Sequence, residues 1–417
     1  MKGNRQMHVT IRPIEWRDDH MRVGADVTGH PGWRLRKRNG QLYFDIPAQW
    51  AERSVIQDKP TDLHDAMLRA LIFSAMEAGR PLVVHGNVSR SLLANLHEYQ
   101  HVIHQWWPWY RPVSLAADVE IDAPTDPDAA GRAGILGFSG GLDSIYSLYI
   151  HTRGAIDRDV CDVGACVFVH GFDIPLRDET GYREAFERGQ RITDDVDVPL
   201  IPVRTNLRDL LPWWPHSHGA AIAAVLSLFG TSYRAGLVAS ADFAQLASAA
   251  EIAGIGFGST RWSDPLLSSD SFPIIHDGDD KSRVHKSMIL HDWPVARQNL
   301  RVCWEGKDHA RNCGRCEKCV RQMLAMRAAG IDDLSAFDDR LTPALIRKPK
   351  GWIGALFFSG SNRHAWEQCY RHAEKIGTAE SDEMVALKEI LDETDGPRFN
   401  LRSWSRRRLT PIVARVY

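Results

Sequence analysis

The sequence predicts an α/β protein built on a parallel sheet, and three observations lead to that fold class. From residue 133 onward, short apolar runs typical of buried strands alternate with longer segments of helical periodicity. A glycine-rich loop joins the first of these strands to the first of these helices. Before them, residues 122–133 carry two prolines and several aspartates, as a linker does. Alternating strands and helices favour βαβ units, in which helices cover both faces of a parallel sheet.

Residues 1–121 are predicted to form an added N-terminal α/β domain. Its apolar runs and helical spacings indicate strands at 7–14, 33–46, 81–85 and 111–119, and helices at 62–78 and 90–105. Ser89 stands directly before the second helix, where its hydroxyl would suit an N-cap. No motif in this domain indicates its role.

The second predicted domain spans residues 133–330 and carries the alternating pattern. Its expected strands lie at 133–138, 164–170, 199–203 and 234–240, and its expected helices at 144–152, 182–194, 218–229 and 320–329. A long polar stretch at 261–286 is expected to be a functional or mobile loop. Residues 331–417 are predicted to form a helical C-terminal extension that ends in a basic and apolar tail.

Composition and charge narrow the class of protein. The chain has 417 residues, of which 44% are hydrophobic and 25% charged, as is usual for a globular protein. Its formal net charge of −2 argues against a dedicated nucleic-acid binder. Residues 1–13 lack the apolar core of a signal peptide, and the longest apolar helical stretch, 219–230, is too short to span a bilayer. We therefore expect a cytoplasmic protein without a membrane span.

The loop Ser139-Gly-Gly-Leu-Asp-Ser144 is the most specific motif in the chain. Its place between a strand and a helix leaves backbone N–H groups and the positive end of the helix free to bind an anion. Gly140 and Gly141 allow a close backbone approach, and the two serine hydroxyls can donate hydrogen bonds. Asp143 would repel phosphate, so we expect it to hold a Mg²⁺ ion that bridges the phosphates. The spacing matches neither GxxxxGK[ST] nor GxGxxG.

Four of the seven cysteines form a tight cluster, Cys303, Cys313, Cys316 and Cys319. Two overlapping CxxC steps predict a knuckle whose turn Gly314 permits, and Cys303 would complete a tetrahedral set of thiolates typical of structural zinc. An iron–sulfur cluster and unliganded thiols stay open as alternatives, because CxxCxxC also suits iron. Four thiolates leave no open coordination position, so we expect the metal to stabilise and position the chain.

The loop and the cysteine cluster together resemble one family of PP-loop ATP pyrophosphatases, the 7-cyano-7-deazaguanine synthases and their relatives. The loop matches the SGGxDS signature of that superfamily, which cleaves ATP between its α- and β-phosphates. The cluster matches the family's Cys followed by a CGxCxxC zinc knuckle, here within 303–319. The segment Ser282-Arg-Val-His-Lys-Ser-Met-Ile289 resembles a family segment whose lysine approaches the phosphates, which makes Lys286 the counterpart.

This resemblance implies a PP-loop fold that binds ATP, Mg²⁺ and Zn²⁺. It implies a nucleotide site made of Ser139, Gly140, Gly141, Leu142, Asp143 and Ser144, with Asp143, Lys286 and Arg283 as catalytic residues. The implied reaction forms AMP. An oxygen of a carboxylate or amide-like substrate attacks the α-phosphorus, pyrophosphate leaves, and a nitrogen nucleophile then replaces AMP.

The substrate side is where the sequence departs from that family. Phe168-Val-His-Gly-Phe-Asp173 stands where the family has an FDYGQ-like segment, and His216-Ser-His-Gly219 stands where it has a GRN-type motif. The candidate substrate contacts are Asp173, His218, Asp242 and Asp264. Diverged relatives occur in biosynthetic clusters and antiviral defence operons. A deazaguanine precursor, another small molecule and a protein acceptor therefore stay open, as does a homodimer.

Two other functions fit parts of the pattern. PP-loop enzymes that thiolate tRNA or small molecules activate their substrate in the same way, but they need a persulfide cysteine or an iron–sulfur cluster and usually a basic RNA surface. No cysteine outside the cluster stands in an evident nucleophile motif. The other function is that of a non-catalytic, zinc-stabilised partner-binding subunit. The intact loop argues against it, because a decayed site would tend to lose Asp143 or the glycines.

Overall fold

The computed structural model describes residues 6–29, 40–52, 54, 60–122, 132–154, 162–241, 256–303, 305–347 and 360–393. The chain divides into two compact units. The first combines Met1–Ser139 with Asp143–Asp279, and the second combines Gly140–Leu142 with Asp280–Tyr417. All strands that the structure describes lie in the first unit, and the described elements of the second unit are helices.

The strands of the first unit join one mostly parallel sheet, so the predicted α/β class is confirmed. They are β1 (Met7–Ile11), β2 (Glu15–Trp16), β3 (His20–Thr28), β4 (Gln41–Pro47), β5 (Leu82–Ser89), β6 (Leu115–Ile121), β7 (Gly134–Gly137), β8 (Val163–His170), β9 (Leu200–Thr205), β10 (Gly236–Ala239) and β11 (Ile274–Asp277). The order across the sheet is β11-β10-β7-β8-β9-β4-β3-β1-β5-β6, with β2 paired to β3.

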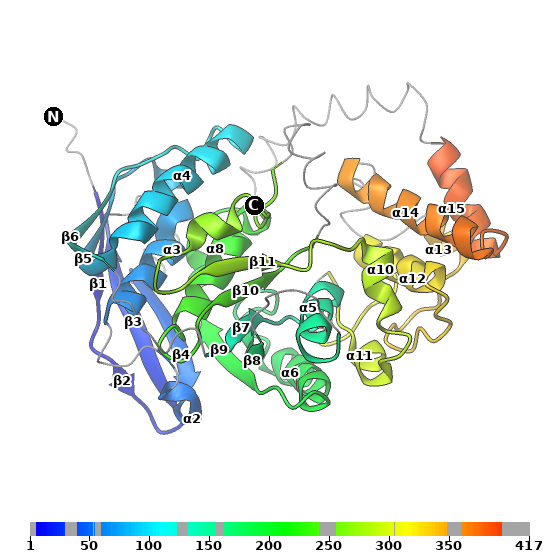
Figure 1. The fold of residues 1–417 in the computed structure, drawn as a ribbon, viewed down its shortest axis with the longest axis horizontal. Coiled ribbons are helices and arrows are strands. Elements are labelled where there is room, and N and C mark those ends of the chain that lie inside the picture. The colour runs from blue at the N-terminus through cyan, green and yellow to red at the C-terminus, as the bar shows by residue number, and fades with distance from the viewer. Residues whose placement is uncertain are drawn as a thin grey trace. The chain divides into compact units, whose positions relative to one another are not determined.

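The helices of the first unit connect these strands. They are α2 (Ala48–Ala51), α3 (Pro60–Ala78), α4 (Arg90–Trp106), α5 (Leu142–Thr152), α6 (Glu179–Asp194), α7 (Leu207–Leu210), α8 (Trp214–Ser227) and the 3₁₀ helix η2 (Asp264–Leu267). Figure 1 shows α3 and α8 on one face of the sheet and α5 and α6 on the other. Right-handed crossovers require this split, because the chain moves from β7 through β8 to β9 and then returns to β10 on the other side of β7.

The parallel half of the sheet has the strand order of a doubly wound fold. Numbered from β7, its order β9-β8-β7-β10-β11 is the 3-2-1-4-5 order of doubly wound sheets. All four pairings within it are parallel. The order reverses between β7 and β10, and folds of this kind bind ligands beyond the carboxyl ends of the strands at such a switch point. The loop of residues 139–144 follows β7 and therefore stands there.

The N-terminal strands continue the same sheet through an antiparallel junction between β4 and β9. Phe44 lies opposite Thr205, and Asp45 lies opposite Arg204. The side chain of buried Asn206 joins the two strands, because it accepts from the Tyr43 N–H at 3.0 Å and donates to the Gln41 carbonyl at 2.8 Å. The described strands before residue 122 and those after residue 133 thus share one sheet, whereas the sequence suggested two domains joined by a linker.

Strands and helices with strong periodicity lie within a few residues of their predicted bounds, but besides the two-residue β2, two strands were missed. In β3, Gly24 and an exposed Asp26 interrupt the apolar pattern. Gly24 is required by a close approach of the neighbouring strand, since a Cβ there would lie 2.6 Å from the Leu42 carbonyl oxygen. The other missed strand, β11, lies within the long polar stretch. Ser89 stands directly before α4 as predicted, but its hydroxyl makes no capping hydrogen bond.

Helix α3 is buried on all sides and anchors the segment that leads to β11. Its residues from Leu63 to Met76 are all buried, and it packs against β5 and α8. Buried Arg69 donates from Nε to the Leu267 carbonyl at 2.7 Å and from Nη2 to Ser269 Oγ at 3.3 Å. The N-terminal segment therefore fixes residues 267–269, between η2 and β11.

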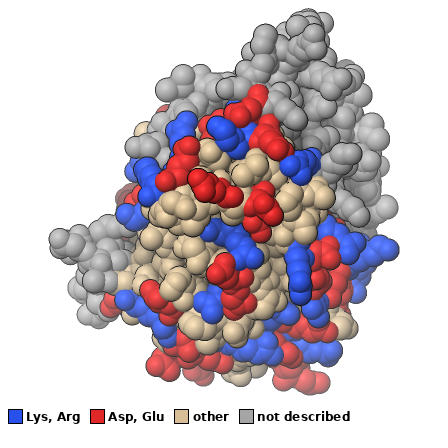
Figure 2. All heavy atoms as spheres, turned by 90° about the vertical axis from the view of Figure 1, so that its right-hand side faces the viewer, with Lys and Arg blue, Asp and Glu red and all other residues tan. Residues whose placement is uncertain are grey.

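The described part of the second unit consists of helices and the cysteine cluster. Its helices are α10 (Arg283–Met288), α11 (Pro294–Asn299), α12 (Glu317–Ala328), α13 (Pro343–Arg347), α14 (Gly360–Ile376) and α15 (Asp382–Glu393). Exposed ion pairs such as Arg347–Glu389 and Lys388–Asp392 place positive and negative side chains next to each other. Figure 2 shows basic and acidic side chains interspersed over one face of the molecule. The predicted basic tail lies outside the described residues.

No helix within the described ranges combines the length and the apolar character that a membrane span requires.

We expect Asn206→Ala to lower the free energy of unfolding by about 2 kcal/mol, because it removes both side-chain hydrogen bonds at the β4–β9 junction. Chemical denaturation measures the change. The control is Arg12→Ala, which removes the ion pairs of Arg12 with Glu15 and Asp26 near the surface and should cost less than about 1 kcal/mol. Equal losses in the two variants would contradict the role given to Asn206.

Candidate metal centre and phosphate loop

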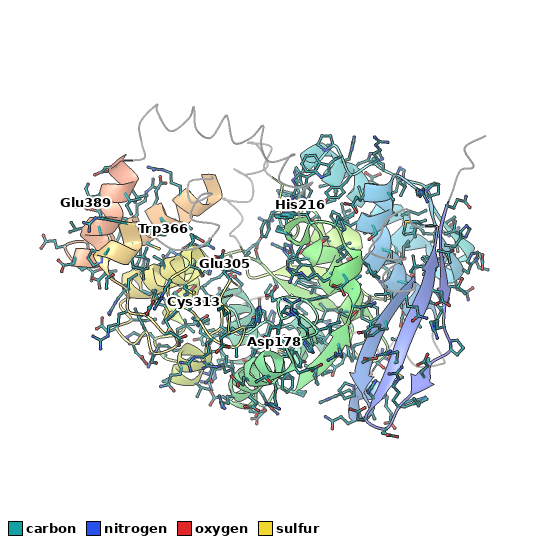
Figure 3. All side chains as sticks on the ribbon, turned by 180° about the vertical axis from the view of Figure 1, so that it is seen from behind. Asp178, His216, Glu305, Cys313, Trp366 and Glu389 are labelled. Atoms are coloured by element: carbon teal, nitrogen blue, oxygen red, sulfur yellow. The ribbon has the colours of Figure 1, made fainter. Side chains whose placement is uncertain are left out.

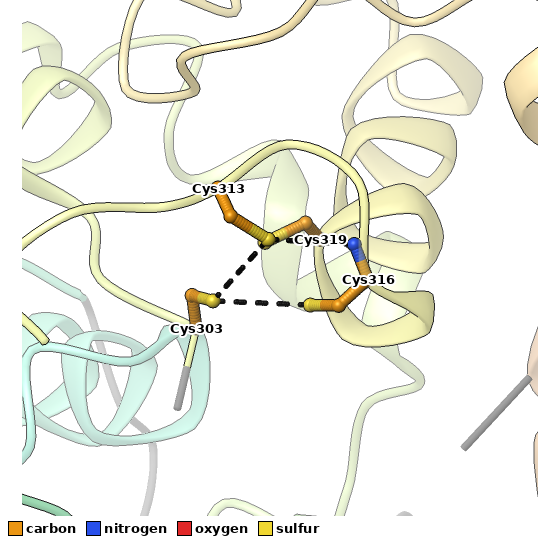
Figure 4. A group of neighbouring side chains, drawn as sticks. All are labelled: Cys303, Cys313, Cys316 and Cys319. Atoms are coloured by element: carbon orange, nitrogen blue, oxygen red, sulfur yellow. Dashed lines mark hydrogen bonds between the residues drawn. The ribbon is translucent and has the colours of Figure 1, made fainter. Parts of the chain in front are cut away.

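The four predicted cysteine ligands come together in the second unit (Figure 4). Their sulfur atoms all lie within 4.8 Å of one another. Cys303 Sγ is 3.6 Å from Cys313 Sγ and 3.8 Å from Cys316 Sγ, and Cys313 Sγ is 3.9 Å from Cys319 Sγ. Cys303, Cys316 and Cys319 are buried, and Cys313 is half-buried.

These distances fit a tetrahedral metal site. Four sulfurs at about 2.3 Å from a zinc ion are separated by about 3.8 Å. A disulfide would bring two sulfurs to about 2.05 Å, so the cluster is not a pair of disulfides. The N–H groups of Arg315 and Cys316 point to Cys313 Sγ at 3.5 and 3.4 Å, which stabilises a thiolate. The four cysteines could therefore bind a metal such as zinc.

The electrostatics of the four thiols also suit a bound cation. Hydrogen bonding from Cys313 lowers the pKa of the Cys303 thiol, while hydrogen bonding to Cys303 raises the pKa of Cys316 and of Cys319. The first sulfur to ionise thus keeps others protonated. A divalent metal resolves this conflict, because it binds thiolates and displaces their protons.

The cysteine knuckle depends on two residues that are not ligands. Gly314 has φ +69°, and a Cβ there would lie 2.6 Å from the backbone nitrogen of Asp339. Buried Asn312 accepts at Oδ1 from the N–H groups of Val302 and Cys303, at 2.8 and 3.0 Å. Its Nδ2 donates to the carbonyls of Leu300 and Ala336, at 2.7 and 3.0 Å. Asn312 therefore holds the segment of the first ligand against the knuckle, and sequence reasoning missed it.

The predicted phosphate loop lies between β7 and α5, so its strand–loop–helix setting is confirmed. Gly140 has φ +72°, a conformation that favours glycine. The Ser139 N–H points to Ser144 Oγ at 3.3 Å, and the hydroxyls of these two serines are 3.4 Å apart. Ser144 is buried, Ser139 is exposed, and Asp143 is half-buried in the first turn of α5. Backbone N–H groups at the start of a helix can bind an anion.

One backbone hydrogen bond ties this loop to the segment that carries Cys303. The N–H of Arg301 donates to the Gly140 carbonyl at 2.8 Å, and both residues belong to the second unit. Arg301 also donates from Nε to the His309 carbonyl at 2.8 Å. Residues 140–142 of the loop therefore cluster with the metal centre and not with the sheet.

The two predicted phosphate-binding cations lie on α10 of the second unit. Lys286 is buried, as a charged residue is only when it has partners. Arg283 donates from Nη1 to Gln322 Oε1 at 3.0 Å, and Gln322 Nε2 donates to Ser287 Oγ at 3.0 Å. Gln322 is fully buried on α12, the helix that carries Cys319. The helix that carries Cys319 thus supports the helix that carries Arg283 and Lys286.

Aromatic residues surround the predicted histidines at the start of α8 in the first unit. His216 stacks on Trp107 with ring centroids 3.7 Å apart, and its Nδ1 is 3.1 Å from the Tyr110 hydroxyl. Burial, with a smaller contribution from His218, lowers the pKa of His216 to about 3. His216 is therefore neutral near pH 7 and can accept the Tyr110 hydrogen bond. Figure 3 labels His216 among these side chains.

Three exposed aromatic side chains rim this group, Trp109, Trp213 and Phe257. The His218 ring lies 5.2 Å from Phe257, and burial lowers the pKa of His218. Because α8 connects parallel strands, it runs antiparallel to them and begins at their carboxyl edge. The sequence could not reveal this cluster, since Trp107, Trp109 and Tyr110 come from the N-terminal segment.

The predicted substrate aspartates have different surroundings. Asp264 is fully buried, and its Oδ2 lies 2.6 Å from Ser259 Oγ and 2.8 Å from His276 Nδ1. It therefore positions His276 on β11. No sequence motif pointed to Ser259. Asp173 is half-buried after β8, near Arg208. Asp242 lies outside the described residues.

Comparison with known proteins found no match for this chain. No protein-family model matches the chain, and neither a curated protein nor a solved structure matches it. The family resemblance drawn from the loop and the cysteine motif therefore stays a prediction.

We expect about one metal ion per chain in the purified protein and far less in Cys319→Ala, which removes one of four ligands. Cys166→Ala is the matched control, because Cys166 is a buried cysteine of β8 outside the cluster. Elemental analysis of gel-filtered protein measures the metal. The same content in all three proteins would exclude the cysteine cluster as its site.

Acid should destabilise the fold through His216. Its pKa of about 3 lies below the unfolded value of about 6.5, so the unfolded chain binds more protons between these values. Stability then falls as the pH is lowered from about 6.5 towards about 3. From about pH 6 to about pH 4, the wild type should lose about 1 kcal/mol per pH unit more than His216→Gln. Denaturant titrations at several pH values test this, and parallel curves for the two proteins would refute it.

Proposed function

We propose that this chain is an AMP-forming, ATP-dependent ligase of the kind found among relatives of 7-cyano-7-deazaguanine synthase. The observation that carries the proposal is the Ser139–Ser144 loop, which follows β7 at the switch point of a 3-2-1-4-5 sheet. Its glycine in the left-handed region, its two serine hydroxyls and the start of α5 suit a phosphate chain.

The proposed chemistry begins with the activation of a carboxylate or amide-like oxygen. That oxygen attacks the α-phosphorus of ATP, the bond to the bridging oxygen breaks, and pyrophosphate leaves. A nitrogen nucleophile then attacks the activated carbon, AMP departs with the bonding electrons, and the nitrogen loses a proton. Catalysis of this type rests on positioning and on the neutralisation of phosphate charge.

The predicted catalytic residues each have a place in this scheme. Asp143, in the first turn of α5, would hold Mg²⁺. Lys286 and Arg283 would neutralise the β- and γ-phosphates, and they belong to the same compact unit as Gly140–Leu142. We assign zinc to the four cysteines because four sulfurs spaced for a tetrahedron leave no position for a substrate. Zinc would then stabilise the second unit and take no part in the bond changes.

We place the acceptor at the aromatic cluster around His216. Exposed tryptophans offer flat faces for stacking, and a neutral histidine offers a hydrogen-bonding edge. His218 and Asp173 flank the start of α8 and the end of β8, so they remain our candidates for polar contacts. Asp264 would act through His276 and not by direct contact.

Sulfur transfer is less well supported. It needs a reactive cysteine, but Cys166 and Cys369, the described cysteines outside the cluster, are both buried. Burial raises the pKa of each thiol, which makes it a poor nucleophile at neutral pH. Cys161 lies outside the described residues.

Asp143→Ala should reduce substrate-dependent release of pyrophosphate from ATP by at least about a hundredfold, because the metal-bridged phosphates lose their protein ligand. A coupled pyrophosphate assay with candidate carboxylates and amides measures the rate. Asp195→Ala is the matched control, since Asp195 lies after α6 and pairs with Arg153 at the surface.

An unchanged rate in Asp143→Ala would refute the proposed mechanism. A wild-type protein that binds Mg·ATP but releases no pyrophosphate with any acceptor would favour the non-catalytic subunit.

A further inference from the structure

The segment 300–303 has its backbone groups bound at both ends. At one end, the Arg301 N–H donates to the Gly140 carbonyl of the phosphate loop at 2.8 Å. At the other, the N–H groups of Val302 and Cys303 both donate to Asn312 Oδ1. The Leu300 carbonyl accepts from Asn312 Nδ2 at 2.7 Å. This segment, called the strap below, leaves little freedom between the loop and the cysteine cluster.

The strap is also buried and short. Leu300, Arg301, Val302 and Cys303 are all buried, and only Val302 separates Arg301 from the first cysteine of the cluster. Asn312 is buried as well, and its amide uses both donors and two acceptor positions. A shift of Cys303 therefore cannot be absorbed by a flexible side chain or by solvent.

The metal determines where Cys303 lies. With a metal ion, the Cys303 sulfur is fixed relative to the knuckle, because a tetrahedral ion sets the sulfur distances. Without one, only weak S–H hydrogen bonds join the four sulfurs. The position of Cys303, and with it the Arg301 N–H, then loses its strongest restraint.

The loop is sensitive to such a change. Gly140 and Gly141 lose more conformational freedom on ordering than other residues, so the loop needs external restraints to hold one shape. The Arg301 bond to Gly140 is a restraint on the glycine whose φ lies in the left-handed region.

We infer that the strap and Asn312 are positioning elements through which the metal state of the four cysteines sets the order of the phosphate loop. One consequence rests on the proposed function: if the loop binds the ATP phosphates, loss of the metal weakens that binding. By linkage, a phosphate chain bound at the loop would raise the affinity of the cysteines for their metal by the same factor.

The test compares Arg301→Pro with Arg301→Ala. Both variants lose the guanidinium and its bond to His309, but only proline also loses the N–H that binds Gly140. Leu300 has φ −52° and ψ 132°, which suits a residue before proline. Hydrogen exchange is followed in the peptide 138–144, with and without metal.

Metal removal should raise exchange in this peptide about tenfold in the wild type and in Arg301→Ala, and reloading with zinc should reverse it. Zinc-loaded Arg301→Pro should already show the raised exchange and should change little when the metal is removed. Peptides of α15 and β5 serve as controls for unfolding of each unit. The inference is overturned if metal removal does not change hydrogen exchange of the peptide 138–144 in the wild type. It is also overturned if metal removal raises exchange in α15 by the same factor.

A second measurement separates this inference from the proposed function. Mg·ATP affinity, measured by calorimetry on zinc-loaded proteins, should be about tenfold weaker in Arg301→Pro than in Arg301→Ala. Suppose that neither the wild type nor any variant binds Mg·ATP, but that hydrogen exchange of the loop depends on the metal. The role of the strap is then supported and the proposed function is wrong. Suppose instead that both variants bind Mg·ATP with the same affinity and that hydrogen exchange of the loop does not depend on the metal. The proposed function is then supported and the role of the strap is wrong.

Discussion

Parallel strands cannot be joined by tight turns, and this constraint shapes the first unit. Each crossover returns the chain over a face of the sheet, so the carboxyl ends of β7, β8, β9, β10 and β11 meet at one edge. The reversal of strand order between β7 and β10 marks the place on that edge where a ligand binds in folds of this type. The glycine-rich loop follows β7 directly, and α8 begins at the same edge. Two segments with different chemistry, one suited to phosphate and one aromatic, are thus placed by topology alone.

The N-terminal segment contributes to this arrangement through its contacts with the later strands and helices. It extends the sheet through the β4–β9 junction, which buried Asn206 joins with two hydrogen bonds. Its helix α3 holds the backbone before β11 through Arg69. The residues after α4 supply Trp107, which stacks on His216, and Tyr110, whose hydroxyl lies beside the same ring. A change in this segment would therefore alter the surface on which we place the acceptor, while the phosphate loop is formed by other residues.

The sequence predicted the parts of the molecule that are encoded locally. The βαβ alternation, the loop between β7 and α5, and the grouping of four cysteines each depend on spacing within one short segment, and the structure confirms them. What it could not predict depends on pairing between distant segments. The β4–β9 junction and the stacking of Trp107 on His216 leave no periodic pattern. Asn312 was missed for another reason. An asparagine before a cysteine reads as an ordinary turn residue until its four hydrogen bonds are seen.

Electrostatics decides what a metal in the second unit can contribute to a phosphate site. A divalent ion bound by four thiolates carries a formal charge of about −2, so the complex does not attract phosphate. Arg311 and Arg315 on the knuckle do not reverse this sign, since they pair with Asp338 and Asp339. The contribution must then be geometric and must pass through bonds that hold position, such as the one from the Arg301 N–H to Gly140. The positive charge that phosphate needs has to come from residues outside the cluster, and α10, supported on α12 through Gln322, carries both Arg283 and Lys286.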